Sequence, residues 1–313
     1  MLHYLARRIV STLPILLGVA LVFFLVFNLV GGSERFLYNI LPPKGRTPET
    51  INQYREAYGL DRPVIVQFLD TVGDMVTFDF GRSESTRQKV SYLIARYVPA
   101  SAALAVPAFA VEIALALALA MLCARTRGRW PDRLVGVLSV AGMSLPMLAL
   151  VIIGQRFLAF EAGLFPISGW TRGLGAVRYL ALPWLLWVTV TVGYDVRFFR
   201  TALVEEQGKE YVRAALAKGM PRRLVMRRHV LRNALVPILT YVVIQVPFLL
   251  TGSMLLERFF SIPGIGELLV QAILSYDLPV MKATVTFYTL FFIGFSVVTD
   301  LLYAAVDPRV RLG

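Results

Sequence analysis

EEQGKEYVRAALAKGMPRRLVMRRHVLRN, residues 205–233, is the polar stretch that decides the fold, because long apolar segments lie on both sides of it. Its first half contains Ala214–Ala217, a run that favours helix and leaves a surface of small residues. Gly219 and Pro221 follow; glycine suits the left-handed position after a helix end, and proline cannot continue the helix. The stretch therefore predicts a helix, a sharp turn and a second helix that starts at Pro221.

Charge in this stretch is dense and mostly positive. Residues 197–232 hold ten Lys or Arg, and residues 205–210 hold three Glu. Glu205 and Lys209 are four residues apart and Glu210 and Arg213 are three apart, so each pair is expected to share one face of the first helix. This part of the chain is expected to lie in water beside a membrane.

Composition outside this stretch is that of a membrane protein. The 313-residue chain is 57% apolar and 17% charged, and its apolar residues gather in runs that reach the roughly 20 residues needed to cross a bilayer. The predicted fold is an all-α membrane protein with six spans. The spans are expected at residues 9–30, 100–123, 134–160 with a break at Pro146, 177–196, 236–256 and 280–306.

Positive charge also predicts the orientation of the spans. With the N-terminus inside, the cytoplasmic pieces hold 18 Lys or Arg, whereas the short outer loops hold four. The net charge of +12 is explained by this distribution, and it does not require a nucleic-acid partner. We therefore expect both termini in the cytoplasm and no nucleic acid among the partners.

The predicted organisation has four parts. An N-terminal segment with the first span occupies residues 1–30, and an extracytoplasmic loop occupies 31–97. The loop has mixed charge, and short helices are expected near 50–58 and 64–77. Spans two to six, with a cytoplasmic loop at 201–233, form a core at 98–306, and a cytoplasmic tail follows at 307–313.

The sequence offers no catalytic residues. It lacks a Gly-x-x-x-x-Gly-Lys-Ser/Thr phosphate-binding loop, so we do not expect this chain to hydrolyse ATP. No Ser-His-Asp set or pair of carboxylates can be assembled, and the chain has only two His and one Cys, which argues against a metal site. The single cysteine, Cys123, is expected to be buried and inert.

Ionisable residues inside the spans are few, and in a membrane such groups face the bundle interior or pair with one another. Glu112 is the only acid well inside a span. A hydrogen bond between helices is one role for it, and lining a transport pathway, together with Gln245, is the other. Asp195 and Arg197 are placed at a span end, where they need no functional role.

The polar stretch resembles the EAA loop of the permease subunits of ABC importers. Ala214, Ala215 and Gly219 have the spacing of the family pattern Glu-Ala-Ala-x-x-x-Gly, and Arg213 stands where the Glu would be. YVRAALAKG followed by HVLRNALVP, residues 211–219 and 229–237, is similar to the branch that transports dipeptides, oligopeptides and nickel. A Pro263-Gly264-x-Gly266 turn after the fifth span, and a closing Asp-Pro-Arg, are also typical of that branch.

The resemblance implies a type I ABC importer permease in a bacterial cytoplasmic (inner) membrane. It implies a second, homologous permease subunit as heterodimer partner, two cytoplasmic ATPase subunits that hold Mg-ATP, an extracytoplasmic substrate-binding protein and a peptide substrate. No cofactor would be bound by this chain, and lipid would surround it. The residues that would couple it to the ATPase are Glu210, Tyr211, Arg213, Ala214, Ala215, Lys218 and Gly219.

Alternatives remain at this point. The loop can also be a basic cytosolic connection that only follows the distribution of positive charge. Within the family, nickel or another small solute is an alternative cargo. A self-sufficient channel or secondary transporter would need internal repeats or ion-coupling carboxylates near the midplane, and an intramembrane enzyme would need a nucleophile and base or metal ligands; the sequence offers neither.

Overall fold

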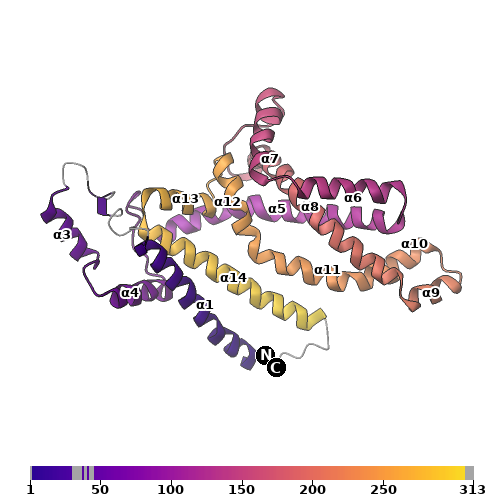
Figure 1. Cartoon of the computed structure of the whole chain (residues 1–313), viewed down its shortest axis with the longest axis horizontal. Helices are drawn as coiled ribbons and strands as arrows, with labels where there is room; N and C mark the ends of the chain where they lie inside the picture. The colour runs from indigo at the N-terminus through magenta and orange to yellow at the C-terminus, as the bar shows by residue number, and fades with distance from the viewer. Residues whose placement is uncertain (1, 30–36, 39–40, 42–45, 307–313) are drawn as a thin grey trace. The chain divides into compact units, whose positions relative to one another are not determined.

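The computed structural model describes residues 2–29, 37–38, 41 and 46–306. Within those residues β-structure is limited to an isolated bridge between Arg82 and Lys89, and the rest of the regular structure is helical (Figure 1). The helices are α1 (Leu2–Leu29), α3 (Pro48–Ala57), α4 (Val64–Thr77), α5 (Val90–Arg125), α6 (Trp130–Met143), α7 (Met147–Ile153), η2 (Gly154–Glu161), η3 (Gly173–Gly175), α8 (Ala176–Gln207), α9 (Glu210–Ala217), α10 (Arg222–Val225), η4 (Met226–Val230), α11 (Leu231–Gln245), η5 (Val246–Phe248), α12 (Leu249–Phe260), α13 (Ile265–Ser275) and α14 (Leu278–Val306). The predicted tail at 307–313 lies outside the described residues.

Four helical segments of the described chain are long and apolar enough to cross a membrane: Val90–Arg125, Gly173–Gln207, Arg222–Phe260 and Leu278–Leu301. They contain most of the spans predicted second, fourth, fifth and sixth, and an all-helical architecture satisfies backbone hydrogen bonds where no water is present. Residues 9–29 of the first predicted span lie in α1, whose apolar part among the described residues is Pro14–Phe27. The count of six spans stays a prediction.

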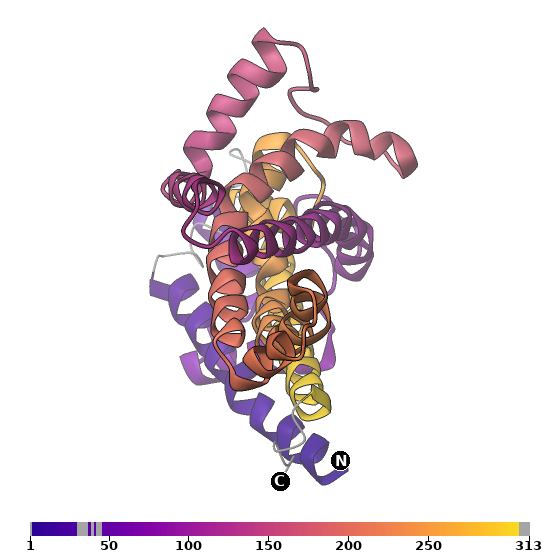
Figure 2. The same ribbon diagram turned by 90° about the vertical axis from the view of Figure 1, so that its right-hand side faces the viewer.

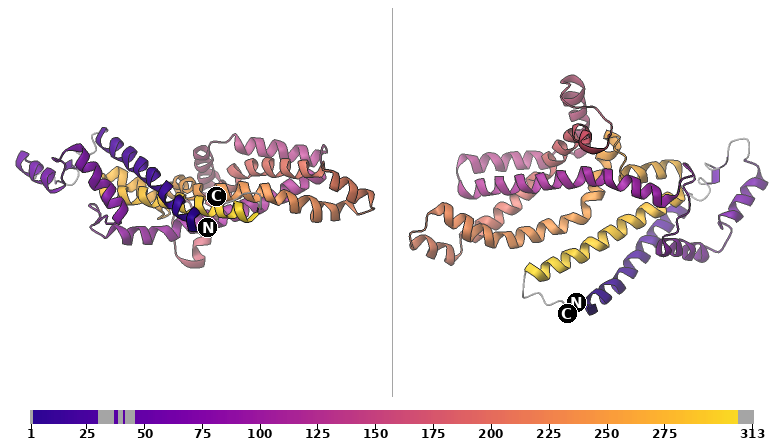
Figure 3. Two further views of the ribbon diagram at one scale, coloured as in Figure 1. Left: turned by 90° about the horizontal axis from the view of Figure 1, so that it is seen from below. Right: turned by 180° about the vertical axis from the view of Figure 1, so that it is seen from behind.

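The third predicted span is not a straight crossing. α6 and the helix Met147–Glu161 meet at a bend of 94°, with Pro146 at the break (Figure 3). Proline fixes its own φ and cannot donate a backbone hydrogen bond, so the position of the break follows from the sequence. If the bent pair counts as one span, the described residues hold five candidate spans.

The predicted helices of the first loop are confirmed. α4 has the predicted bounds, Val64–Thr77, and α3 occupies Pro48–Ala57. Thr47 caps α3: its hydroxyl oxygen accepts a hydrogen bond from the backbone N–H of Thr50 at 3.2 Å. Proline follows at the first helical position, where its missing N–H has no cost.

The chain divides into two compact units, one built mainly from residues 1–101 and 263–297, the other mainly from 102–262. In the first unit Asp277 is 1% exposed and fixes the segment before α5. Its Oδ2 accepts hydrogen bonds from the hydroxyls of Ser83 and Ser85 at 2.6 and 2.7 Å. Lys282 and Asp74, 2.8 Å apart, join α14 to α4 within the same unit.

Close helix packing characterises the second unit, where α6 and α8 run side by side (Figure 3). A Cβ at Gly193 would lie 2.6 Å from the carbonyl oxygen of Ser139, and a Cβ at Gly142 would lie 2.7 Å from that of Thr189. Only glycine permits these two backbones to approach so closely, which is the usual way helices pack in membranes.

Candidate functional site

The polar stretch folds as the predicted helix, turn and helix, at the end of the second unit that faces the viewer in Figure 2. α9 ends at Ala217, and Gly219 has a φ of +79°. The N–H of Gly219 donates to the carbonyl of Leu216 at 3.0 Å, and the N–H of Met220 donates to that of Ala215 at 3.2 Å. This pair of bonds is the Schellman motif, in which a left-handed residue ends a helix.

The second helix begins at Arg222, directly after Pro221, and continues through η4 into α11. Pro221 has an extended backbone, with φ −65° and ψ 136°, and serves as the cap residue. The predicted start was Pro221 itself, one residue earlier. The turn at Gly219 therefore leads directly into the membrane-length segment Arg222–Phe260.

One prediction about this stretch was wrong. Glu205 and Lys209 do not share a helix face, because α8 ends at Gln207 and Lys209 is the cap before α9. Gly208 separates the two helices and interrupts the register. Glu210 and Arg213, by contrast, are both in α9 and both exposed.

Tyr211 ties α9 to the end of α8. Its hydroxyl donates a hydrogen bond to Glu206 Oε2. Burial and this bond raise the pKa of Tyr211, so its hydroxyl stays protonated at neutral pH and remains a donor. The side chain is 37% exposed, so Tyr211 also contributes to the outer surface of the hairpin.

α9 has one face turned into the protein and one face turned away from it. Val212 and Ala215 are buried, whereas Arg213 and Ala214 are exposed. The expectation that both alanines form an outer small-residue surface is therefore wrong for Ala215. An acidic substitution at Ala215 would place a charge in the core, so it would test folding and not docking.

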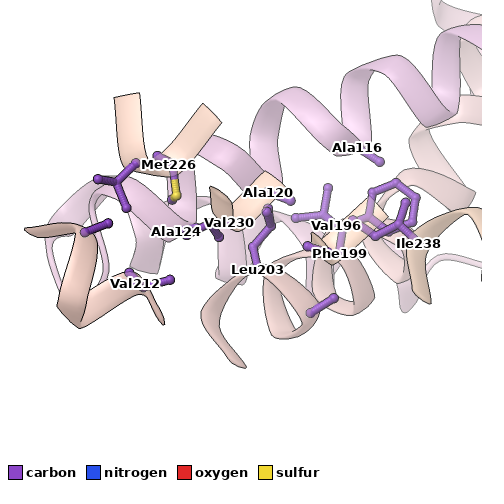
Figure 4. Packing of buried hydrophobic residues seen from close by; sticks show 14 residues of the cluster. Ala116, Ala120, Ala124, Val196, Phe199, Leu203, Val212, Met226, Val230 and Ile238 are labelled. Atoms are coloured by element: carbon purple, nitrogen blue, oxygen red, sulfur yellow. The ribbon is translucent and has the colours of Figure 1, made fainter. Parts of the chain in front are cut away.

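The buried face of α9 belongs to a core that continues into the spans. Val212 packs in the same cluster as Val230 at the start of the α11 segment, Ala120 of α5 and Leu203 of α8 (Figure 4). The Gln207 amide donates to the carbonyl of Ala124 at 2.9 Å. Because this packing is continuous, displacing α9 must disturb α5, α8 or the segment that leads into α11.

An ion pair between α6 and α8 stabilises the region next to this core. The Arg200 guanidinium on α8 binds the carboxylate of Asp132 on α6 through two bonds of 2.6 and 2.8 Å. Asp132 also accepts the backbone N–H of Gly128 at 2.9 Å, which fixes the loop before α6. Two-pronged bonding of this kind is the strongest form of Arg–carboxylate pair. Nothing in the spacing of 68 residues between Asp132 and Arg200 indicates a contact, so this ion pair could not be predicted from the sequence.

A turn and a short helix follow the fifth predicted span, but the left-handed bend falls on Ser261 and not on the predicted residues. α12 ends at Phe260, Ser261 has a left-handed φ of 53°, and Gly264 caps the short helix α13. Pro263 precedes that cap, and Gly266 is the second residue of α13 itself and not part of the turn. The first N–H of α13, from Ile265, donates to the hydroxyl of Ser101 at 2.8 Å, so it is satisfied although buried. Cys123, as predicted, is a buried free thiol.

Glu112 joins two helices. Its side chain is 2% exposed, and its Oε2 accepts the indole N–H of Trp187 on α8 at 2.9 Å. Gln245 of α11 donates to Asp195 of α8 at 3.2 Å, and the Glu112 and Asp195 side chains also interact. Of the two roles considered for Glu112, the hydrogen bond between helices is the one seen in this conformation.

The prediction that Asp195 lies at the end of a span is also wrong. It does not lie at the end of a span but well inside α8, which continues to Gln207, and it is 1% exposed. The hydropathy of the sequence falls after Val196, so it places the end of the span too early. No sequence signal relates Asp195 to its partners on α5 and α11.

Glu112 yields a prediction that separates its two roles. Glu112→Leu should lower the free energy of unfolding by about 1–3 kcal/mol, because it leaves the Trp187 N–H buried without an acceptor. Glu112→Gln keeps an acceptor and should unfold at a temperature close to that of the unchanged protein. Thermal unfolding of the purified protein measures both. A Leu variant as stable as the unchanged protein would refute the structural role, and a stable Gln variant without transport would establish a pathway role.

Metal-binding residues are not grouped in residues 2–29, 37–38, 41 and 46–306: no three His, Cys, Asp or Glu side chains there are placed to hold an ion. The polar stretch presents a structured surface. It consists of an exposed, mixed-charge helix face, a fixed turn behind it, and a core that links both to the spans.

Comparison with known proteins identifies the class. Residues 116–312 match the family described as "Binding-protein-dependent transport system inner membrane component", and residues 1–105 match its N-terminal companion, "Binding-prot-dependent transport system membrane comp, N-term". The chain belongs to this family. It is thus a multi-pass membrane permease of a bacterial ABC importer and not itself catalytic, and the system to which it belongs also includes a binding protein and an ATPase.

Similar proteins cover almost the whole chain. A putative peptide transport system permease protein of Brucella abortus is 35% identical over 309 residues, 97% of this chain and 98% of that protein. The dipeptide transport system permease protein of Lactococcus lactis is 36% identical over 314 residues, 100% of both chains. The glutathione transport system permease protein of Salmonella typhimurium is 35% identical over 312 residues, 99% of both.

A solved structure supports the fold. A chain of the MetNI methionine ABC transporter, in an inward-facing crystal form, superposes with a TM-score of 0.56 at 20% identity. The match covers 69% of this chain and 97% of the other. At this identity the likeness supports the helical permease fold and nothing about cargo.

Proposed function

We propose that this permease imports peptides across the bacterial cytoplasmic membrane. The proposal rests on full-length similarity to permeases named for peptide, dipeptide and glutathione transport. Glutathione is itself a tripeptide, so the three names share one cargo class. The cargo would be delivered by the binding protein and moved at the expense of ATP hydrolysed elsewhere.

The proposed assembly is a heterodimer of this chain with a second, homologous permease, and each permease carries one cytoplasmic ATPase subunit. Mg-ATP would be held by the ATPase subunits, and this chain would bind no cofactor of its own. The contact with the ATPase would be the exposed face of α9, which presents Glu210, Arg213 and Ala214, with Tyr211 and the cap residue Lys218 at its edge. The turn at Gly219 would set the orientation of that face, and the buried Ala215 would pack α9 against the core.

The proposed topology has six spans, with both termini and the loop at 201–233 in the cytoplasm. Residues 1–30 would hold the first span, 31–97 the outer loop, 98–306 the permease core and 307–313 the tail. The excess of Lys and Arg in the loop around α9 supports this orientation. The segment with Pro263, Gly264 and Gly266 would then lie on the outer side.

Thiol labelling in intact spheroplasts tests the topology. Cys123 is buried, so it contributes little background. Cysteine in place of Glu49, exposed in α3, should react with a membrane-impermeant maleimide. Cysteine in place of Arg228, exposed in η4, should react only after the membrane is permeabilised. The reverse pattern would contradict the orientation and with it the proposed contact with the ATPase.

Uptake by the reconstituted importer tests the cargo. Proteoliposomes that contain both permeases and both ATPases, with binding protein outside, should accumulate a labelled dipeptide or glutathione only when ATP is enclosed. Nickel ions are the matched alternative substrate in the same vesicles. ATP-dependent uptake of nickel without uptake of either peptide would overturn the peptide proposal while leaving the assignment as permease intact.

A further inference from the structure

Two carboxylic acids meet inside the second unit, although nothing in the sequence relates them. Glu112 of α5 is 2% exposed and Asp195 of α8 is 1% exposed, and their side chains interact directly. Both belong to the compact unit built mainly from residues 102–262. Acids are almost never buried this fully unless they are paired with a cation or carry a proton. The charge of this pair therefore needs an explanation.

The protein supplies no cation to the pair. Among the described residues, no Lys, Arg or His forms an ion pair with either acid. The polar side chains that face the two acids are those of Trp187 and Thr191 on α8 and of Tyr241 and Gln245 on α11. Of these four only Tyr241 can titrate, and a phenol is neutral at physiological pH. Two ionised carboxylates would therefore carry two negative charges without compensation.

The hydrogen bonds of the pair are incomplete without a further proton. Glu112 Oε2 accepts the indole N–H of Trp187 at 2.9 Å, and Asp195 Oδ1 accepts the amide of Gln245 at 3.2 Å. Asp195 Oδ2 is buried and receives no hydrogen bond from the described part of the chain. Ionised carboxylates only accept hydrogen bonds, so two of them cannot bond to each other. A proton on one acid gives the pair its missing donor and removes one of its charges.

Apolar packing surrounds the two acids. Ala116, one turn along α5 from Glu112, and Val196, next to Asp195, both belong to the buried core of this unit. Tyr241 is fixed beside the pair because its ring stacks on Phe198, with the ring centroids 4.1 Å apart. In such surroundings two like charges in contact are strongly disfavoured, and a pair of acids then retains one proton.

We propose that Glu112 and Asp195 bind a single proton between them and that this proton joins α5 to α8. One carboxyl group donates the shared proton to the other, which is then the only carboxylate of the pair. The indole N–H of Trp187 and the amide of Gln245 stabilise the charge that remains. The proton belongs to the pair and not to either acid alone.

The shared proton lies where the helices on both sides of α9 meet α5. α8 comes directly before α9 in the chain, and α11 follows it after α10 and η4. Glu112 belongs to α5, Asp195 to α8 and Gln245 to α11, so the pair and its donor hold three helices together. Separating α5 from α8 would break the shared hydrogen bond, so the proton stabilises this arrangement of the helices.

A sodium ion is the alternative occupant for a pair of acids. An ion bound by both would lie between their oxygens and hold them apart, whereas these two side chains contact each other directly. Within the part of the chain that the structure describes, no three His, Cys, Asp or Glu side chains are placed to hold a metal ion. Direct contact therefore favours a proton over a metal ion.

Infrared difference spectroscopy of the purified permease complex tests the proposal. A protonated carboxyl has a C=O stretching band, shifted in D2O, that a carboxylate lacks. The variants are Glu112→Gln and Asp195→Asn, in which an amide N–H takes the place of the shared proton and leaves the other acid ionised. The matched control is Asp132→Asn, which removes a buried acid of the same unit that already has a cation, Arg200. Size-exclusion chromatography verifies that each variant is folded and assembled.

At neutral pH the unchanged protein and the control should show the band of one protonated carboxyl that both pair variants lack entirely. Loss of only part of this band in each variant would mean two acids protonated independently and would overturn the proposal. A pair variant that keeps the whole band would overturn it as well. Loss of the band from the unchanged protein when sodium chloride replaces choline chloride would identify a metal-ion site and would also overturn it.

Discussion

Replacing Gly219 with valine is expected to leave the permease in the membrane at normal level but to weaken its hold on the ATPase about tenfold. Gly219 has a φ of +79°, a conformation that costs an L-residue roughly 1–2 kcal/mol and costs a β-branched residue most. A Cβ at this position would meet no atom within 4 Å, so the strain is in the backbone alone. The variant relieves this backbone strain by changing φ at position 219, and α9 then leaves its proposed docking position.

To dock on the ATPase, α9 of the variant must return to its original position, and the backbone strain at position 219 then lowers the binding affinity. A cost of 1.4 kcal/mol corresponds to about a tenfold loss of affinity. Gly128 supplies the control, because it has a φ of +77° and equally open surroundings in the other loop placed in the cytoplasm. Gly128→Val carries the same backbone strain outside the proposed contact. Co-purification of the ATPase and peptide uptake measure the difference. Equal retention and uptake in the two variants would mean that the turn at Gly219 has no special part in coupling.

Replacing Ala214 with tryptophan is the second change with a large expected effect. Ala214 is the exposed small residue on the outer face of α9, where a docked protein would approach most closely. A large side chain forced into a packed contact costs about 1–3 kcal/mol, so ATPase affinity should fall by about tenfold or more. Because Ala214 is exposed, the stability of the permease itself should change by less than about 0.5 kcal/mol.

Ala57→Trp is the matched control for this substitution. Ala57 is also an exposed alanine near the end of a short helix, but it belongs to α3 in the loop predicted to lie outside. ATPase retention should be unchanged in that variant. The idea of a docking face on α9 would fail if the Ala214 variant kept its ATPase as well as the Ala57 variant did.

The features that the sequence predicts correctly have local causes. Gly219 and Pro221 act within one turn of the chain, so a helix, turn and helix can be inferred from residue types alone. The start of α4 follows from Pro63 before it, whereas its end is set by Phe78, which takes a left-handed conformation with a φ of 58°. Span lengths follow from runs of apolar residues, which do not depend on partners elsewhere in the chain.

The features that the sequence misses depend on contacts between distant segments. Ala214 and Ala215 are the same residue type, and only the packing of Val212 and Val225 decides which alanine is buried. Asp195 is stabilised inside α8 by groups on α5 and α11, whereas its own neighbours in sequence indicate a span end. Pro146 predicts a break, but the 94° angle there depends on what the two helices pack against.

Cross-linking from α9 in the assembled importer tests the central claim, that its exposed face docks on the ATPase. Lys218 is exposed at the edge of that face, so a cysteine there can carry a maleimide–benzophenone reagent without blocking the contact. The control carries the same reagent on a cysteine in place of Glu49. In both proteins Cys123 is replaced by alanine. Irradiation should join the ATPase to the permease labelled at position 218 and not to the one labelled at 49. No cross-link from 218, in a complex that retains ATPase activity, would contradict the account.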